Sequence, residues 1–304
     1  MVGGKVGGPF HERTARIKGA SIRYFLGGEG EPIVLVHGLG GGAANWVELA
    51  PELACRRRVL ALDLPGHGGS EPLPAAPTLA AYADRVVLLM EGEEIAPAPI
   101  VGHSFGGTVA LRAAIRWPDA VTGVVVAAGA GISTGRRVAQ ATVFAAGLVR
   151  PGRIAARFRG PIARFPAVRQ LVFGGWGVAD PGAFPPQAVE GFLAPQALHR
   201  DTWSAGRAIV REDPRTALDR VGCPCLVLWG ARDAMVPVAD GFEYARRLRA
   251  PLRVIADCGH LLIAERPDAC LDAIEAFADA LEQRATDRGP KVHEASAGER
   301  RAQG

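Results

Sequence analysis

The sequence Gly-His-Ser-Phe-Gly-Gly occupies residues 102–107 and fits the pattern G-x-S-x-G. An apolar segment, Pro99–Val101, precedes it, and a stretch with helical periodicity, Gly106–Arg116, follows it. This pattern is typical of a sharp strand-to-helix turn, which points a serine hydroxyl outward and excludes bulk two residues away on either side. The segment therefore predicts a nucleophilic Ser104 at the carboxyl end of a buried strand.

A second glycine-rich turn follows an earlier strand. The apolar segment Pro32–Val36 ends abruptly in His37-Gly38-Leu39-Gly40. Acyl transfer needs two backbone N–H groups aimed at the oxyanion that develops on the substrate. We predict that one belongs to Phe105, after the serine, and the other to Leu39, whose flanking glycines let the backbone approach a substrate. The alternative is an ordinary glycine-rich loop at a strand end.

Seven histidines compete for the role of general base. His260 follows the last expected strand, Leu252–Ile255, so it should lie at the same edge of the sheet as Ser104. His103 is adjacent to the serine, and its side chain should point away from the site. The others lie near the termini, in loops after early strands or in the middle of the chain: His11, His293, His37, His67 and His199. We predict His260 as the base.

The base needs a carboxylate to orient it. Asp233 comes directly after the apolar segment Cys225–Trp229, in Gly-Ala-Arg-Asp. Asp63 also ends a strand at that edge, but a loop carboxylate that binds backbone amides is the preferred interpretation there. Asp257 is so close to His260 in sequence that a local loop role is expected. We therefore predict Asp233 as the orienting acid.

Short apolar segments alternate with helical stretches, which favours a mostly parallel sheet buried on both faces. The expected strands are Thr14–Lys18, Ser21–Leu26, Pro32–Val36, Val59–Leu62, Pro99–Val101, Thr122–Ala128, Cys225–Trp229 and Leu252–Ile255. The expected helices include Leu79–Met90, Gly106–Arg116 and Pro267–Glu282. We predict a flexible tail over residues 1–12, an α/β core over 13–131 and 220–284, a helical cap over 132–219 at the carboxyl edge of the sheet, and a flexible tail over 285–304.

The motifs together resemble the α/β-hydrolase superfamily, from Thr14 to about Glu282. They are HGLG at 37–40, DLPGHGGS at 63–70, GHSFGG at 102–107, GARDAMVP at 230–237 and GHLLIAERP at 259–267. This resemblance implies the α/β-hydrolase fold, with an eight-stranded, mostly parallel sheet, a helical cap after the sixth strand, and no cofactor. It agrees with a catalytic set of Ser104, Asp233 and His260.

Individual residues narrow the chemistry further. Relatives that open epoxides or displace halides carry an aspartate where Ser104 stands. Relatives that cleave carbon–carbon bonds in ring-fission products commonly have tryptophan after the catalytic histidine, and here Leu261 occupies that position. Val236 and Leu261 should face the substrate. The sequence therefore predicts a carboxylic-ester hydrolase for small to medium apolar substrates. The alternatives are a carbon–carbon hydrolase of a vinylogous diketone or dienoate acid, and a non-catalytic ligand receptor.

The expected cap is rich in aromatic and basic residues. Its aromatics either line an apolar pocket or pack the cap on the sheet: Phe158, Phe165, Phe173, Trp176, Phe184, Phe192 and Trp203. Its arginines either steer anionic substrates or form a solvated helix face: Arg136, Arg137, Arg150, Arg153, Arg157, Arg159, Arg164 and Arg169. The apolar run Val138–Val149 beside them could touch a lipid surface or pack on the sheet.

Composition excludes several classes of protein. The net charge is +4, but the arginines are scattered and aromatics make up only 6% of the 304 residues, so no nucleic-acid partner is expected. Five cysteines match neither a disulfide framework nor a zinc site, and no metal ligand set is apparent. No secretory signal or run of ~18 apolar residues is seen, so we expect a cytoplasmic protein without stable membrane insertion. The oligomeric state stays open.

Overall fold

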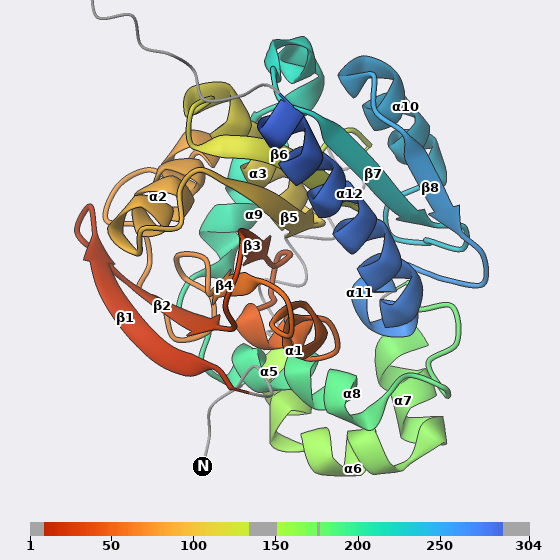
Figure 1. Cartoon of the computed structure of the whole chain (residues 1–304). Helices are drawn as coiled ribbons and strands as arrows, with labels where there is room; N and C mark the ends of the chain where they lie inside the picture. Colours follow the sequence, from red (N-terminus) through yellow and green to blue (C-terminus); the bar gives the residue numbers. More distant parts are fainter. Residues whose placement is uncertain (1–8, 134–150, 175–176, 288–304) are drawn as a thin grey trace, which may run out of the picture.

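The computed structural model describes residues 9–133, 151–174 and 177–287. Its strands form one eight-stranded sheet in the order β1-β2-β4-β3-β5-β6-β7-β8 (Figure 1). The strands are β1 His11–Ile17, β2 Ala20–Gly27, β3 Pro32–Val36, β4 Arg58–Leu62, β5 Ala98–His103, β6 Val121–Ala127, β7 Cys225–Gly230 and β8 Leu252–Ile255. Pairs β1–β2 and β2–β4 are antiparallel, and the other neighbours are parallel. The predicted α/β architecture is confirmed.

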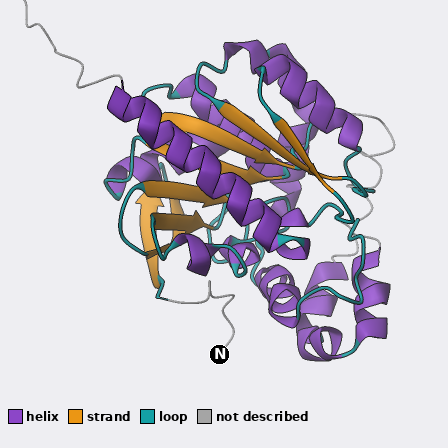
Figure 2. Cartoon of the chain, turned by 45° about the vertical axis from the view of Figure 1, so that its right-hand side comes forward, coloured by secondary structure: helices purple, strands orange, loops and turns teal. Residues whose placement is uncertain are grey.

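Helices cover both faces of the sheet (Figure 2). They are α1 Ala50–Leu53, α2 Leu79–Gly92, α3 Phe105–Arg116, α10 Val238–Leu248, α11 Leu262–Glu265 and α12 Pro267–Asp287. Helix α12 packs on β6, where Gly123 faces Phe277 and Leu281. Central strands such as β7 are therefore buried along their whole length. Complete burial of one valine or leucine side chain contributes roughly 1.5–3 kcal/mol, which explains the continuous apolar runs.

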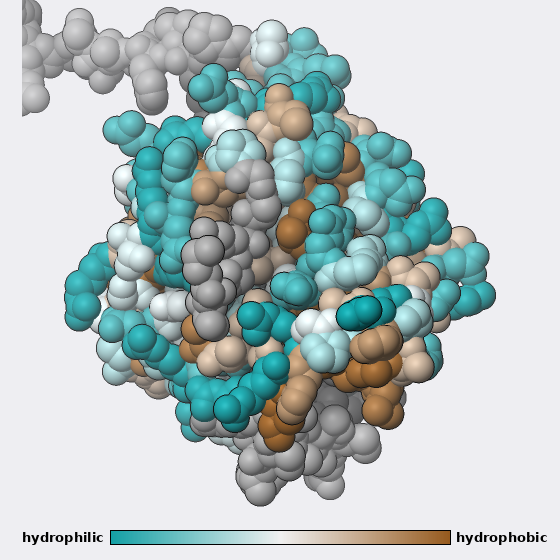
Figure 3. Space-filling model, turned by 90° about the horizontal axis from the view of Figure 1, so that it is seen from below, coloured by the Kyte–Doolittle hydropathy of each residue, from teal (hydrophilic) through white to brown (hydrophobic). Residues whose placement is uncertain are grey.

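Between β6 and β7 the described chain is helical and contains no strand. Its α-helices are α5 Pro151–Arg157, α6 Arg159–Arg164, α7 Pro166–Phe173, α8 Pro186–Leu193 and α9 Thr202–Arg211. Helices α7 and α8 begin at a proline, whose missing N–H costs nothing at a first turn. Helices α5 to α8 gather at one end of the molecule, at the bottom of Figure 1, and Figure 3 views the molecule from that end.

The first strand begins earlier than predicted. His11 and Glu12, assigned from the sequence to a flexible tail over residues 1–12, pair with Leu26 and Phe25 in the β1–β2 ladder. The strand lies at the edge of the sheet and is mostly exposed, so its charged side chains give no apolar pattern. Residues 1–8 of the predicted tail lie outside the described residues.

The last helix ends later than predicted. Helix α12 continues past Glu282 to Asp287, three residues into the predicted tail over 285–304. Its final turn is exposed. The backbone hydrogen bonds of that turn form without apolar side chains, so the sequence shows no apolar periodicity there. Residues 288–304 lie outside the described part of the chain. Over the described residues, no helix has the length and apolar character needed to cross a membrane.

Candidate active site

Ser104 lies between β5 and α3 with φ 52° and ψ −115°, a backbone conformation that a non-glycine residue adopts only under strain. The neighbouring glycines make this turn possible. A Cβ atom on Gly102 would lie 2.3 Å from the carbonyl oxygen of Gly106, and one on Gly106 would lie 2.1 Å from that of Val36. The spacing G-x-S-x-G thus reflects contact between backbones on both sides of the serine.

Replacement of Gly106 by alanine is expected to destabilise the fold by at least about 1–3 kcal/mol, because rigid backbone lies where the methyl group must go. Urea unfolding measures the change. The matched control is Gly92→Ala in α2, where the added methyl group meets no atom within 4 Å. That variant should be neutral or slightly stabilising. Equal stability of the two variants would contradict the close approach at Gly106.

The structure brings the three side chains predicted to be catalytic into one chain of contacts. Nε2 of His260 lies 3.1 Å from Oγ of Ser104, and Nδ1 lies 2.8 Å from Oδ2 of Asp233. The other oxygen of that carboxylate accepts the N–H groups of Met235 and Val236. All three side chains are buried. Chemically, this arrangement can move a proton from a hydroxyl to an imidazole whose far nitrogen is held by a carboxylate.

The alternative carboxylates lie elsewhere. Asp63 is buried and accepts hydrogen bonds from Nε of Arg23 and from the N–H groups of Ala43 and Gly69, as expected of a structural loop carboxylate. Asp257 is exposed and forms an ion pair with Arg232 at 2.7 Å. Neither carboxylate contacts His260.

Four other histidines are buried and hold loops around the site. Nε2 of His103 contacts the backbone oxygen of His260 at 2.9 Å. Nε2 of His37 accepts a hydrogen bond from the N–H of Leu64. The centroid of the His67 ring lies 5.1 Å from that of His37 and 5.4 Å from that of His199. Burial lowers the pKa of His37 and of His103 to about 3, and it also lowers the pKa of His67 and of His199.

The protein is expected to lose stability as the pH falls below 6.5. The unfolded chain takes up protons at these imidazoles near pH 6.5, whereas folded His37 and His103 do so only near pH 3. Their stabilising contribution is thus complete above the unfolded pKa and is lost on acidification. Each imidazole with a folded pKa near 3 lowers the free energy of unfolding by about 2 kcal/mol at pH 5 relative to neutral pH. Urea unfolding at pH 7 and pH 5 measures the loss, and His103→Gln should reduce it. If the free energy of unfolding of His103→Gln fell as much between pH 7 and pH 5 as that of the wild type, other groups would be responsible for the acid sensitivity.

Sequence reasoning missed Glu265, in the short helix α11. This half-buried carboxylate accepts the N–H groups of Gly259 and Leu261, on either side of His260, and that of Ala179. Burial raises the pKa of Glu265. The N–H of His260 itself donates to the carbonyl oxygen of Gly177 at 2.7 Å. The loop that carries the imidazole is therefore fastened on one side by Glu265 and on the other by the segment 177–179.

Replacement of Glu265 by glutamine is expected to lower kcat roughly ten- to hundredfold, with a smaller change in KM, because an amide N–H₂ must then face backbone donors and the imidazole shifts. Steady-state kinetics separates the two constants. Glu52→Gln, at an exposed position in α1, is the control and should retain full activity. A raised KM with unchanged kcat would contradict a role in positioning the imidazole.

A cavity of about 180 Å³ opens over Ser104 and His260. Leu39, Val236 and Leu261, all predicted to bind substrate, line it. The rest of its wall is mostly apolar and comes from several elements, including Ala130, Phe192, Ile209, Val210 and Met235. The ring of Phe105, the fourth predicted binding residue, packs against Tyr82 away from the cavity, so only its backbone can serve the site.

The two roles left open for the aromatics between β6 and β7 are divided among them in the structure. Among the described cap aromatics, Phe192 lines the cavity, whereas Phe173 and Phe184 pack on each other in the core. Phe158 and Phe165 are exposed. The physical reason is that α8 and α9 reach the site, while α5 to α7 lie farther out. Trp176 falls outside the described residues.

The predicted arginine cluster divides in the structure. Arg136, Arg137 and Arg150 lie outside the described residues, as does the apolar run Val138–Val149. Arg169 is buried, and its guanidinium donates to the carbonyl oxygens of Pro181, Ala163 and Gly182, so it is not part of a solvated face. No described arginine lines the cavity.

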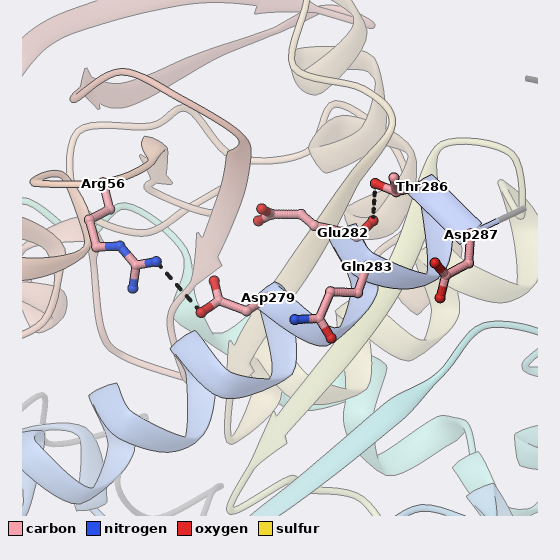
Figure 4. Close-up of a pocket in the computed structure, with 6 residues that line it drawn as sticks. All are labelled: Arg56, Asp279, Glu282, Gln283, Thr286 and Asp287. Carbon is pink, nitrogen blue, oxygen red and sulfur yellow. Dashed lines mark hydrogen bonds and ion pairs between the residues drawn. The ribbon is translucent and has the colours of Figure 1, made fainter. Parts of the chain in front are cut away.

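A second hollow lies beside α12 and contains none of the predicted site residues (Figure 4). Its lining is polar: Arg56, Asp279, Glu282, Gln283, Thr286 and Asp287. Arg56 pairs with Asp279 across it, and the neighbouring Arg57 pairs with Asp279 and Glu282. These ion pairs fasten α12 to the turn before β4. Over the described residues, no group of three or more potential metal ligands is found.

Residues 33–273 match the sequence pattern of the alpha/beta hydrolase family. The chain belongs to this family. It is 32% identical over 276 residues to the dihydrolipoyllysine-residue acetyltransferase component of the acetoin cleaving system of Pseudomonas putida, covering 87% of this chain and 68% of that protein. The corresponding Cupriavidus necator protein is 32% identical, with 83% and 65% covered. This alpha/beta hydrolase thus spans about two thirds of the length of both relatives.

Shorter relatives of this alpha/beta hydrolase include enzymes of two chemistries. The 2-hydroxymuconate semialdehyde hydrolase of Pseudomonas sp. strain CF600 is 30% identical, with 77% of this chain and 81% of that protein covered. The pimeloyl-[acyl-carrier protein] methyl ester esterase of Neisseria meningitidis serogroup B is 33% identical, with 74% and 83% covered. A putative lipase from Acinetobacter baumannii AYE shares the fold, with a TM-score of 0.72 at 20% identity over 90% of this chain and 93% of that one.

Proposed function

We propose that this alpha/beta hydrolase is a serine esterase that cleaves carboxylic esters of small to medium apolar substrates. The observation that carries the proposal is the contact chain from Oγ of Ser104 through the imidazole of His260 to Asp233, buried beneath a largely apolar cavity. In this proposal Ser104 is the nucleophile, His260 the general base and Asp233 the orienting acid.

The reaction proceeds in two halves. Nε2 of His260 takes the hydroxyl proton of Ser104 as Oγ bonds to the ester carbonyl carbon, which gives a tetrahedral oxyanion. When the oxyanion collapses, the bond to the alcohol oxygen breaks and the imidazolium gives that oxygen its proton. Water then gives a proton to His260 as its oxygen bonds to the carbonyl carbon of the acyl-enzyme, which forms a second tetrahedral oxyanion. When this oxyanion collapses, the bond from carbon to Oγ breaks, the imidazolium returns its proton to Oγ, and the carboxylic acid leaves. Asp233 stabilises the imidazolium in both halves.

The oxyanion is stabilised by the N–H groups of Leu39 and Phe105. Phe105 is the first residue of α3, so its N–H has no acceptor within the helix. Within the described parts of the chain, neither of the two N–H groups donates to another residue. Leu39 lines the cavity in the turn after β3, and Phe105 directly follows Ser104 at the start of α3. Donors kept free in this way act on the charge that develops in the transition state.

In this proposal residues 132–219 form a cap over a core that comprises residues 11–131 and 220–287, because β1 begins at His11 and α12 ends at Asp287. Helices α8 and α9 contribute Phe192, Ile209 and Val210 to the cavity wall, opposite the strand ends that carry the catalytic residues. The cap therefore sets the space open to the acyl or alcohol group. A cavity of about 180 Å³ suits a short to medium apolar chain better than a long one.

A panel of p-nitrophenyl esters of increasing acyl length tests the proposal. We expect the largest kcat/KM for short to medium acyl chains, and stoichiometric labelling of Ser104 by a fluorophosphonate probe. Mass spectrometry of the labelled peptide identifies the residue. Labelling without turnover of any ester would indicate a different substrate class, and absence of labelling would favour a non-catalytic ligand receptor.

Carbon–carbon bond hydrolysis is the second candidate, favoured by 30% identity to a 2-hydroxymuconate semialdehyde hydrolase. The same nucleophile, base and oxyanion donors would serve it. Against it stands Leu261, at the position where relatives of that chemistry commonly carry tryptophan. Product analysis with a dienoate run beside the esters distinguishes the two, because faster cleavage of the carbon–carbon bond would reverse the assignment.

A further inference from the structure

Helices α5, α6 and α7 and the turns between them carry exposed arginines and exposed large apolar side chains, and α6 packs against both α5 and α7. We name this region the α5–α7 surface and define it by Arg153, Arg157, Phe158, Arg164, Phe165 and Leu171. The two phenylalanines are 57% and 50% exposed and the leucine is 84% exposed. Exposed apolar side chains that lie together often mark a site where a protein or a membrane binds.

The charge of this surface is of one sign. Residues 151–174 contain five arginines and no acidic residue, whereas the whole chain has 31 acidic residues in 304. In the described ranges, no ion pair involves Arg153, Arg157 or Arg164. The surface therefore presents guanidinium groups without a carboxylate partner, and such groups bind phosphate oxygens in bidentate geometry. One nitrogen of the Arg153 guanidinium also donates to the carbonyl oxygen of His199 at 2.7 Å.

The arrangement of the two residue types points to the kind of partner. Arg157 precedes Phe158, and Arg164 precedes Phe165, with the Arg164 guanidinium 5.5 Å from the Phe165 ring centroid. A protein interface separates an apolar centre from a charged rim. At a bilayer surface, guanidinium groups lie at the level of the phosphates while neighbouring apolar side chains enter the acyl boundary. Because each of the two exposed phenylalanines directly follows an arginine, charged and apolar side chains are not segregated here, which fits the second arrangement.

The position of the α5–α7 surface on the molecule also allows it to contact a flat bilayer. Helices α6 and α7 lie at one extremity of the molecule (Figure 1). Seen from that end, hydrophobic side chains lie beside hydrophilic ones toward the lower right of the face (Figure 3). None of the six residues lines the cavity over Ser104. The α5–α7 surface is thus separate from the site that takes the substrate.

We propose that the α5–α7 surface docks the protein peripherally on a bilayer that contains anionic phospholipid. The arginines supply attraction to the headgroup phosphates, and Phe158, Phe165 and Leu171 enter the interface. The docking does not depend on the proposed esterase activity, because it uses neither the cavity nor the catalytic residues.

Cosedimentation with sucrose-loaded vesicles tests the proposal. The full chain should bind vesicles of phosphatidylglycerol and phosphatidylcholine, bind pure phosphatidylcholine far more weakly, and dissociate as salt rises. The triple variant Arg153→Gln/Arg157→Gln/Arg164→Gln is expected to bind about a hundredfold more weakly, since each basic residue near such a surface contributes about fivefold. The triple variant Phe158→Ser/Phe165→Ser/Leu171→Ser should bind roughly tenfold more weakly.

Matched controls remove the same residue types elsewhere. Arg220→Gln/Arg249→Gln/Arg253→Gln removes three exposed arginines outside the surface, and Phe242→Ser removes a phenylalanine that is 59% exposed on α10. Both controls should bind as the wild type does, and thermal unfolding verifies that every variant is folded. Equal losses in the controls, or equal binding to both kinds of vesicle, would overturn the proposal.

Self-association is the competing outcome. Sedimentation velocity on the wild type and on the apolar triple variant detects it, and a dimer abolished by that variant without vesicle binding would overturn the proposal in favour of an interface between copies. Ser104→Ala is expected to bind vesicles as the wild type does. Failure of vesicle binding therefore leaves the esterase proposal intact, and loss of esterase activity leaves the docking proposal intact.

Discussion

The Ser104→Ala variant is expected to lose at least about 10⁴-fold in kcat while the protein remains folded. Removal of Oγ removes the atom that attacks the carbonyl carbon, and neither oxyanion donors nor substrate binding can replace it. Alanine adopts the same backbone conformation at no greater cost than serine, so the free energy of unfolding should change by less than about 1 kcal/mol. Ester hydrolysis, fluorophosphonate labelling and urea unfolding measure the three quantities.

A second serine provides the control. Ser204, in α9, is also buried, but its hydroxyl donates to Asp201 and does not contact an imidazole. Ser204→Ala should keep full labelling and turnover, with at most a small loss of stability. Residual hydrolysis above about 1% of the wild type in Ser104→Ala, after excluding contaminating esterase, would refute the nucleophile assignment.

The sequence predicts the central sheet well because burial on both faces leaves a continuous apolar signal. Strand β3 is expected at Pro32–Val36 and has these bounds, and every residue after Pro32 is buried. The edge strand β1 and the last turns of α12 are exposed and polar, so their hydrogen bonds leave no such signal. Prediction therefore failed where backbone pairing alone, rather than apolar burial, extends an element.

Residues at strand ends were predictable for a related reason. Parallel strands bring their carboxyl ends to one edge, so Ser104, Asp233 and His260 could be assigned to one place without knowledge of loop paths. Glu265 could not, because its role depends on Ala179, 86 residues away, and on the exact fold of two loops. The motif that contains it was recognised, but a motif does not show which backbone groups a carboxylate will hold.

The helical segment between β6 and β7 contacts both loops of the candidate site. The carbonyl oxygen of Gly40, next to Leu39, accepts a hydrogen bond from Nε2 of Gln196 at 2.6 Å and contacts Nε2 of His199 at 2.8 Å. On the other side, Gly177 accepts the N–H of His260. This segment thus holds the backbone beside the proposed oxyanion donor Leu39 and the proposed base His260, and substitutions in it are expected to alter kcat as well as substrate preference.

The Asp233→Asn variant is expected to lose about 10⁴-fold in kcat at neutral pH, although the side chain keeps its shape. Oδ1 is held by the N–H groups of Met235 and Val236, so the amide oxygen must occupy that place and the N–H₂ group must face Nδ1 of His260. Nδ1 then has to accept a hydrogen bond, which puts the ring proton on Nε2. An imidazole in that tautomer cannot accept the hydroxyl proton of Ser104, which lies 3.1 Å from Nε2.

Two neighbouring carboxylates separate this tautomer effect from a general loss of negative charge. Asp257→Asn removes an exposed partner of Arg232 and should leave kcat unchanged. Asp63→Asn breaks a buried ion pair with Arg23, so it should lower the free energy of unfolding by about 3–5 kcal/mol while the folded fraction keeps its catalytic chemistry. If Asp63→Asn lost turnover per folded molecule while Asp233→Asn kept it, the orienting acid would be Asp63 and the imidazole would have to turn toward it during the reaction.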